Sequence, residues 1–512
     1  MKFKQGITRE QMSVFSLDCL IAKDNPVRLI DLFVDQLDLV KLGFSKTTVK
    51  QEGCPPYQAK DLLKLYYYGY IGGVRSSRKL EAECERNIEG WWLIRQLRPG
   101  YHTIADFRKN NPVALKGAFK IFVSFLKGED MLSSEVVAID GTKLRAQNSR
   151  RNNYNESKLA KHLAYIENKT QEYICQLEAS DAAENKQAAE LKKKEVIQKL
   201  IVLKERKKKY AALNDALIKS GDTQISTTDA ESRCLPVKEN VTNVCYNIQS
   251  AGDSKHSLIV EFETINEGDQ RQLSTMACKA KQALEVEQII ALADKGYHAG
   301  KQLQACEQQH ITAIVAYPER SNRSKHTDPA YHTEKFGYNA NNDCYTCPQG
   351  ATLTTNGIEF ERKHAGRTTF LVKKYITPQC KRCPVKHLCA VGTTGKRIIE
   401  RSTYQDAIDA NNNRVNQNPE LYKKRQQIIE HPFGTIKRGW GYSYTLLKSI
   451  KKVNGEMAII LTMYNFRRAI SILGVTEMLT RLKKWKPVSF FSNMGLLKPF
   501  YQRQFVEIYL SA

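Results

Sequence analysis

The sequence predicts an α/β protein in which a mixed sheet and its helices are extended by a helical N-terminal region and two insertions. Two short apolar runs, Val136 to Ile139 and Ile289 to Ala293, have the length and composition of buried strands. Apolar residues at helical spacing dominate residues 1–130, 155–221 and 403–475. Strands mixed with helices are typical of an α/β fold. At 512 residues, the chain is longer than one hydrophobic core usually serves, which predicts several domains.

A strong excess of positive charge points to a polyanionic partner. The chain has 79 Lys and Arg against 54 Asp and Glu, a formal net charge of +25. This exceeds the roughly 2–8 charges that keep a small domain soluble, so we expect nucleic acid as the partner. The first residues lack the apolar core of a signal peptide, and runs such as Met457 to Met463 are too short to span a bilayer. We therefore expect a cytoplasmic protein without a membrane segment.

Residues 1–130 are predicted to form a helical N-terminal DNA-binding domain. Apolar residues from Gln58 to Tyr70 share one helical face, and Gly72-Gly73 ends that helix. A Thr-x-x-Asp pattern from Thr103 to Asp106 predicts another helix start. Short helices with basic residues are typical both of a helix-turn-helix-like unit and of a generic helical bundle, and the sequence does not distinguish them.

Residues 131–475 are predicted to form the α/β domain, with a basic tail at 476–512. Residues 155–221 should form a helical hairpin insertion, because mostly apolar residues keep a spacing of 4-3-4-3-4 in the first half and the same rhythm in the second. These residues are Leu159, Leu163, Ile166, Thr170, Tyr173 and Leu177, then Val196, Leu200, Leu203, Lys207 and Tyr210. Lysine runs on the hairpin are more often a solvated face than a phosphate-binding surface, and we favour the former.

A second insertion, residues 337–397, contains five cysteines. Cys344 and Cys347 form one C-x-x-C pair and Cys380 and Cys383 another, with Cys389 nearby. His364 and His387 are further candidate ligands. Paired C-x-x-C units predict a structural Zn²⁺ site, because each pair places two thiolates on one edge of a tetrahedron. Reduced surface thiols or a redox pair are the alternatives.

Two aspartates each follow an apolar run. Asp140 ends the run Val136 to Ile139 and precedes Gly141-Thr-Lys, and Asp294 ends the run from Ile289 and precedes Lys-Gly-Tyr. Carboxylates at the carboxyl ends of strands project from the sheet edge where α/β sites are built. Taken alone, each aspartate is more often a turn or helix N-cap residue than a catalytic one.

A third segment, Tyr422 to Arg438, carries a family resemblance. Its Tyr422, Arg425, Glu430 and Lys437 resemble the Tyr-Arg-Glu-Lys signature of bacterial insertion-sequence DDE transposases. The family has gaps of two, three and six residues, whereas this chain has two, four and six. On a regular helix the extra residue rotates Arg425 by about 100° relative to the family pattern. Pro432 also predicts a helix start or kink there.

Other segments extend the resemblance to about residues 50–475. His102 to Arg108 resembles the family's N-terminal domain, and Asp140 to Lys143 and Ala293 to Tyr297 follow in the family's order. The resemblance implies an RNase-H-like catalytic core with insertions. It also implies that Asp140, Asp294 and Glu430 are catalytic ligands of Mg²⁺ or Mn²⁺. The residues that would contact DNA are Tyr422, Arg425, Lys437 and Arg438.

The function implied by the resemblance is DNA transposition. The protein would bind terminal inverted repeats, cleave the DNA ends and join the 3′-hydroxyls to target DNA by two-metal phosphoryl transfer. It would act in the bacterial cytoplasm at the nucleoid, as a homodimer in the synaptic complex. The heptads at 159–217 offer one dimer interface. The alternatives are a catalytically inactive DNA-binding relative and an RNase-H-like nuclease without strand transfer.

Overall fold

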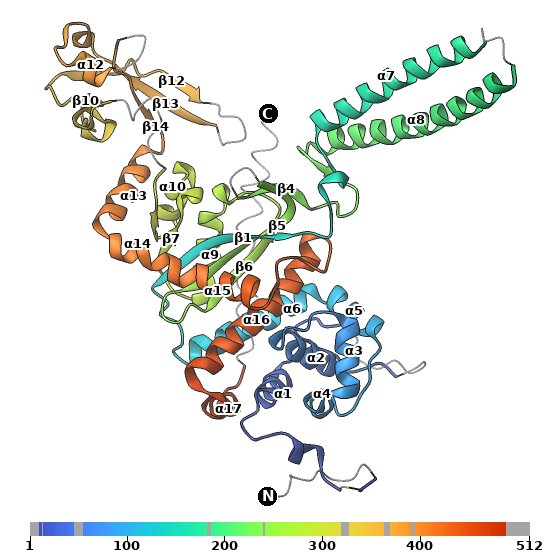
Figure 1. Ribbon diagram of the computed structural model, residues 1–512. Helices are drawn as coiled ribbons and strands as arrows, with labels where there is room; N and C mark the ends of the chain where they lie inside the picture. Colours follow the sequence, from blue (N-terminus) through green and yellow to red (C-terminus); the bar gives the residue numbers. More distant parts are fainter. Residues whose placement is uncertain are drawn as a thin grey trace, which may run out of the picture.

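The computed structural model describes residues 10–12, 14–45, 55–181, 186–238, 241–318, 327–362, 369–390 and 395–487. A mixed sheet flanked by helices lies at the centre of the molecule, with the N-terminal helices beneath it and two units projecting from it (Figure 1). The expected α/β class is therefore confirmed.

The central sheet has six strands. They are β1 (Val136–Arg145), β4 (Arg233–Lys238), β5 (Val241–Asp253), β6 (Ile259–Ile265), β7 (Ile289–Ala293) and β8 (Ile311–Val315). The order is β4-β5-β1-β7-β8, and β6 shares one edge of β5 with β4. β1 is antiparallel to β5 but parallel to β7, and β7 is parallel to β8. The parallel part explains the short, continuously apolar runs, because such strands are covered on both faces.

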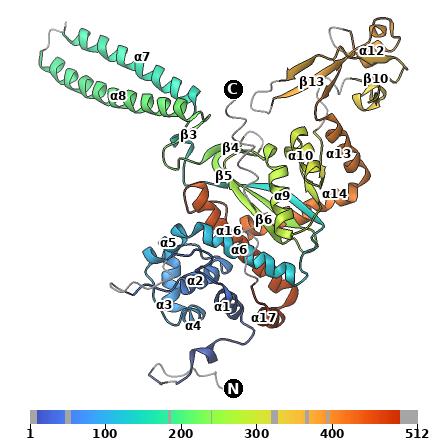
Figure 2. The ribbon, with the colours of Figure 1, turned by 180° about the vertical axis from the view of Figure 1, so that it is seen from behind.

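Helices cover both faces of this sheet. α9 (Leu273–Leu284) and α10 (Gly300–Gln308) pack on one face and are nearest the viewer in Figure 2. The opposite face carries the helical segment 419–439 and α16 (Ile450–Leu473), which lie in front in Figure 1. α13 (Gln405–Gln417) packs against β8 and α10 at the edge. The 3-10 turns η3 (Asp269–Arg271) and η4 (Lys295–Tyr297) follow β6 and β7.

The N-terminal region is helical and shares its core with the sheet. Its elements are η1 (Leu17–Leu20), α1 (Pro26–Gln36), α2 (Ala59–Ile71), α3 (Ser77–Arg86), α4 (Ile88–Leu93), α5 (Tyr101–Asn110) and α6 (Pro112–Gly128). One hydrophobic cluster runs from these helices through the sheet to α16. The buried Lys116 of α6 makes a 2.5 Å ion pair with Glu261 of β6, so α6 is fastened to the sheet edge.

Helix α5 begins two residues earlier than the sequence pattern predicts. The expected start at Thr103 is wrong, because the helix begins at Tyr101 with Gly100 at the N-cap and no side-chain cap from its own segment. Instead, the carboxylate of Glu81 in α3 accepts the free backbone N–H of Tyr101 at 3.1 Å. A tertiary contact therefore supplies the cap that the local pattern placed elsewhere.

The first projecting unit is a pair of antiparallel helices that extends away from the sheet (Figure 1). It consists of α7 (Glu156–Asp181) and α8 (Lys186–Ser220), and a small sheet of β2 (Asn153–Tyr154) and β3 (Ile225–Ser226) closes its base. Leu159, Ile166, Val196 and Leu203 are buried between the helices. These heptad positions, proposed above as a dimer interface, are thus occupied within the chain.

The second projecting unit contains the clustered cysteines and lies on the other side of the sheet (Figure 1). It has two three-stranded sheets and short helical turns around its own core of Phe336, Tyr345, Leu353, Tyr375 and Ile399. The elements are η5 (Pro329–Tyr331), η6 (Thr333–Lys335), β9 (Gly337–Asn339), β10 (Cys344–Thr346), β11 (Thr352–Thr354), β12 (Glu359–Arg362), β13 (Phe370–Tyr375), η7 (Pro378–Arg382), α12 (Lys386–Cys389) and β14 (Ile399–Ser402). Because β14 completes the second sheet, the unit extends beyond the expected boundary at 397.

The start of the predicted basic tail is helical. α17 (Val475–Lys484) packs against α1, and Trp485 lies 5.2 Å from Phe125 and 6.2 Å from Phe33 between ring centroids. The remainder of the tail, from 488, lies outside the described residues. Within the described ranges no single helix has the length and apolar composition of a membrane span; α16 and α17 meet that test only together, across a 111° bend.

Candidate active site

Asp140 and Asp294 come together on neighbouring parallel strands. The register pairs Val136 with Ile290 and continues to Ile139 with Ala293, so the two aspartates occupy the next position. β1 does not end at Asp140, which corrects the sequence-based interpretation. Its antiparallel pairing with β5 continues from Asp140 opposite Ser250 to Arg145, and only the parallel pairing with β7 stops. The site therefore lies where one side of β1 loses its neighbour.

The carboxylate of Asp140 lies in an environment of excess negative charge. Burial, and then the nearby carboxylates of Asp294 and Asp269, raise its pKa to about 6. The backbone N–H of Gly141, which donates to Oδ1 at 2.8 Å, and the guanidinium of Arg425 act in the opposite direction. Such a buried, like-charged pair is the environment that a bound cation would neutralise.

Asp269 belongs to a polar network behind the two aspartates. Its carboxylate accepts hydrogen bonds from Lys143 at 2.5 Å, Asn247 at 2.8 Å and Gln249 at 2.7 Å. The hydroxyl of Tyr297, which follows Asp294 in η4, donates to Gln249 Oε1 at 2.6 Å. No sequence pattern marked Asp269 as a site residue. Asp269 lies in a polar turn after β6, and only the packing of η3 against η4 brings it to the site.

Gly141 is required by close approach rather than by a turn. A Cβ at this position would lie closer than any real contact to the side-chain atoms Gln249 Nε2, Asp269 Oδ1 and Asn247 Oδ1. The Asp-Gly pair therefore places a carboxylate next to a backbone that the polar network can approach. The Asp140-Gly141 pair therefore lies inside a strand, although an Asp-Gly sequence usually indicates a turn.

The helical segment that carries Glu430 is irregular. It runs through α14 (Pro419–Arg425), the π-helical turn η8 (Gln426–Glu430), α15 (His431–Gly434) and a second π-helical turn, η9 (Thr435–Gly439). Pro432 has no N–H to donate, and the carbonyl of Gln427 five residues earlier accepts a hydrogen bond from Ser257 Oγ at 3.2 Å. The helical segment continues through Pro432. The irregularity expected at this proline takes the form of the π-helical turn that directly precedes it, with Pro432 in the first turn of α15.

The π-helical turn also changes the geometry around Arg425. The expected rotation of about 100° applies to a regular helix, whereas residues 426–430 form a wider turn that takes up the extra residue between Arg425 and Glu430. Arg425 Nη2 lies 3.1 Å from Glu430 Oε1 in a salt bridge. η8 packs against β1 and β5, and the bare Cα of Gly252 lets the carbonyl of Ile428 approach the sheet. The segment thus presents Arg425 and Glu430 to the face that carries Asp140.

The three predicted ligands are not equally confined. Asp140 and Asp294 are partly buried, whereas the Glu430 side chain is 51% exposed and is tied to the site through Arg425. Arg425 is buried, and its Nε has no hydrogen-bond partner. In the part of the chain that is described, no group of three or more His, Cys, Asp and Glu side chains lies close enough to hold a metal ion.

The other predicted DNA-contacting residues differ in their surroundings. Tyr422 packs partly buried against the main hydrophobic cluster. Burial, and then the charge of Lys143, lower the pKa of Lys437, whereas Asp140 raises it. Lys437 therefore lies within electrostatic reach of the carboxylates. Arg438, the next residue, is exposed to solvent.

All five clustered cysteines lie in the second unit, and four of them are near enough to influence one another electrostatically. Burial raises the pKa of the Cys389 thiol, and the neighbouring Cys380, Cys383 and Cys347 add to this effect. Cys347 Sγ accepts the backbone N–H of Ala351 at 3.3 Å. Cys344 is buried in β10 and does not contribute to the shift at Cys389. His387 is exposed, and His364 lies outside the described residues.

Comparisons with known proteins define the class. Residues 15–110 match the model of a transposase domain (DUF772), which covers η1 to α5. Residues 346–470 match a transposase DDE domain, which includes most of the cysteine-rich unit, the helical segment with Glu430 and most of α16. No curated protein and no solved structure matches the chain. The two matches support a DDE transposase of the insertion-sequence type, and thus a protein of a mobile element.

Proposed function

We propose that this protein is a DNA transposase that binds the terminal inverted repeats of its element, cleaves the DNA ends and joins the 3′-hydroxyls to target DNA. The observation that carries the proposal is the adjacent register of Asp140 and Asp294, beneath a helix that bears Arg425 and Glu430. The DDE domain match supports an RNase-H-like core, and the helix supports the Tyr-Arg-Glu-Lys signature with one residue added.

Mg²⁺ or Mn²⁺ is the cofactor that the chemistry of the carboxylate donors favours, and Glu430 would have to move toward the aspartates to bind it. Asp140 and Asp294 provide hard carboxylate oxygens, and the raised pKa of Asp140 reflects its burial and then the negative charge of Asp294, which a cation would neutralise. Glu430 would complete the set. When bound, two such ions activate an attacking water or 3′-hydroxyl and stabilise the leaving oxygen of the phosphodiester.

The chain's own residues then bind and orient the DNA strand. The buried guanidinium of Arg425 has an Nε–H without a partner, which favours an incoming phosphate oxygen. Lys437 adds a second positive charge near Asp140. Both would stabilise negative charge that develops on the phosphate as it is attacked. Tyr422 and Arg438 would contact the flanking strand.

Partners and location follow from the same proposal. The DNA substrates would be the inverted repeats and target DNA, and pairing of two ends would require a homodimer at the bacterial nucleoid, in the cytoplasm. Since the heptads of α7 and α8 pack on each other, that dimer would use another surface.

A structural Zn²⁺ in the cysteine-rich unit is a separate proposal. Cys347, Cys380 and Cys383 are near enough to act on the pKa of Cys389, whereas the buried Cys344 is not among the causes of that shift, which favours these four thiols. They would have to move closer together to surround the ion. Metal analysis of the purified protein tests this. Loss of bound zinc in Cys383→Ser, with zinc retained in Cys344→Ser, is the expected result.

The test of catalysis is cleavage and strand transfer on DNA that carries the element's end, with Mg²⁺ or EDTA. Wild type is compared with Asp140→Ala, Asp294→Ala and Glu430→Gln. We expect metal-dependent joining that all three substitutions abolish while DNA binding is retained. Unchanged activity in one variant removes that residue from the site. Cleavage without joining would favour a nuclease, and no cleavage by wild type would favour an inactive DNA-binding relative.

A further inference from the structure

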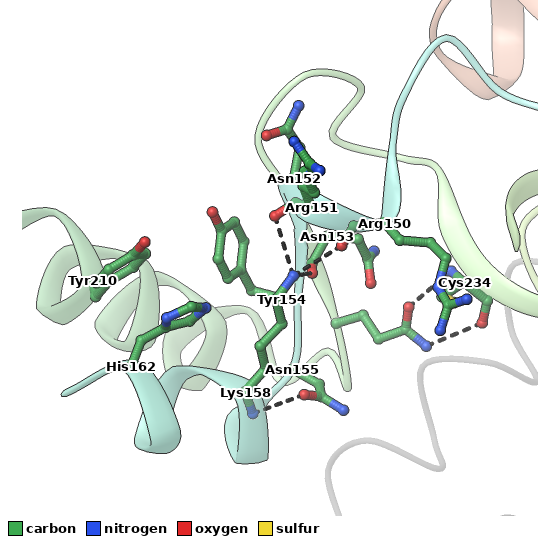
Figure 3. Close-up of a pocket in the computed structure, with 11 residues that line it drawn as sticks. Arg150, Arg151, Asn152, Asn153, Tyr154, Asn155, Lys158, His162, Tyr210 and Cys234 are labelled. Atoms are coloured by element: carbon green, nitrogen blue, oxygen red, sulfur yellow. Dashed lines mark hydrogen bonds between the residues drawn. The ribbon is translucent and has the colours of Figure 1, made fainter. Parts of the chain in front are cut away.

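A pocket at the base of the helical hairpin is lined by cations and aromatic rings (Figure 3). The cavity has a volume of about 710 Å³. Its charged or ionisable side chains are Arg150, Arg151, Lys158 and His162, and Tyr154 and Tyr210 provide rings. Among the described residues, no Asp or Glu lines it. A cavity with this lining favours an anionic ligand.

One of these cations fixes the loop that carries two others. The ammonium of Lys158 donates to the backbone carbonyls of Arg150 at 2.8 Å, Arg151 at 3.1 Å and Asn153 at 2.7 Å (Figure 3). Its charge is therefore used to hold η2 (Arg150–Asn152). The guanidinium groups of Arg150 and Arg151 are exposed, and neither pairs with a carboxylate in the part of the chain that is described. They remain available to an external anion on a backbone that is already fixed.

The aromatic side of the pocket is equally well ordered. The rings of His162 and Tyr210 stack at 4.7 Å with an interplanar angle of 11°, and Tyr154 lies 5.8 Å from Tyr210. Tyr154 belongs to a small hydrophobic cluster with Leu159 and Leu217 at the base of the hairpin. The lining residues are therefore held by their own contacts, which lowers the entropic cost of binding.

The pocket is connected to the carboxylates by one continuous strand. Ten residues separate Asp140 from Arg150, which limits their distance to about 36 Å. Lys143 and the exposed Arg145 lie between them on β1. Each nucleotide of a DNA duplex rises about 3.4 Å along the helix axis, so the pocket lies within roughly ten nucleotides of the candidate cleavage point. A single DNA duplex can therefore contact both places.

We propose that the base of the hairpin is a second DNA-binding surface, on which Arg150 and Arg151 hold backbone phosphates within one helical turn of the cleaved bond. The exposed Arg145 on β1, between the carboxylates and the two arginines of the pocket, favours a DNA strand over an isolated small anion. The position relative to the cleaved bond rests on the proposed function. The binding of DNA phosphates by the two arginines does not.

The test measures affinity for a 40-base-pair duplex by fluorescence anisotropy across a NaCl series, in EDTA so that no catalysis is needed. We expect Arg150→Gln/Arg151→Gln to reduce the slope of log affinity against log salt by about 1.8, since each lost phosphate contact removes about 0.9. The matched control is Lys204→Gln/Lys208→Gln, which removes two exposed charges further along α8. Equal melting temperatures would show that both variants fold.

A slope for the arginine variant that equals wild type overturns the proposal. So does an equal reduction in both variants, because that result reflects total charge and not this pocket. The outcome is independent of cleavage. Failure of metal-dependent cleavage with a selective slope change removes the transposase proposal but leaves the DNA-binding surface in place.

Discussion

The two halves of the candidate active site are held in different ways. On the sheet, Asp140 and Asp294 are placed by strand register, and the network of Gly141, Gln249 and Asp269 fixes the backbone beside them. On the helical segment, Glu430 is half exposed and is restrained by one salt bridge from Arg425 on a π-helical turn. The two aspartates on the sheet are therefore held in place despite the repulsion between their carboxylates. The side chain of Glu430 on the helix, by contrast, has room to move when metal and DNA bind.

The largest effect is expected from breaking the helix side. Arg425→Ala should reduce the single-turnover rate of DNA-end cleavage by about 10²–10³-fold, the usual cost of removing one group that stabilises developing charge. The control is Lys423→Ala on the same segment, an exposed lysine that pairs with Glu420 at 2.7 Å. Equal rates for both variants would mean that Arg425 is only a surface cation, contrary to its burial.

Breaking the sheet side should affect the fold as well. Gly141→Ala should lower the free energy of unfolding by about 1–3 kcal/mol, because the new methyl group overpacks the side chains of Gln249, Asp269 and Asn247. Urea denaturation checks this. Gly268→Ala, where a Cβ meets no atom within 4 Å, should change stability by less than about 0.5 kcal/mol. A Gly141→Ala variant as stable as wild type would show that the side chains of Gln249, Asp269 and Asn247 can move aside at little cost.

Neutralising one carboxylate on each side sharpens the comparison. In EDTA, Asp294→Asn should raise the free energy of unfolding by about 0.2–1 kcal/mol, since it removes a like charge beside Asp140 and keeps the oxygen that accepts the Gly296 N–H. Glu430→Gln should instead lower it, by less than about 1 kcal/mol, because its salt bridge is solvent-screened. Urea unfolding measures both changes. If both variants gain stability or both lose it, the carboxylates on the sheet and on the helix are not held in different ways.

The smallest effect is expected from shortening the π-helical turn. Deletion of Gln426 should convert η8 into a regular helix, keep Arg425 beside Glu430 and change stability by less than about 0.5 kcal/mol. Insertion of one alanine after Gln426 is the opposite test: it should separate Arg425 from Glu430 and reduce cleavage no more than Arg425→Ala does. If the deletion abolishes cleavage while the protein still melts cooperatively, the turn has a role beyond absorbing one residue.

The sequence by itself determined which segments become strands and helices and which carboxylates stand out. The apolar runs before Asp140 and Asp294 correspond to β1 and β7, because buried parallel strands must be apolar throughout. The resemblance around Glu430 drew attention to the helical segment that the DDE domain match covers. The transposase class itself was therefore accessible from local patterns.

The tertiary structure decided everything that depends on contacts between distant segments. Asp269 joins the site only through packing of the turn after β6, and Glu81 caps α5 from another helix. The spacing from Arg425 to Glu430 predicted a rotation on a regular helix, which the π-helical turn removes. Backbone hydrogen bonds can shift from one partner to the next at little cost when packing on the sheet compensates. A residue count along the chain does not contain that information.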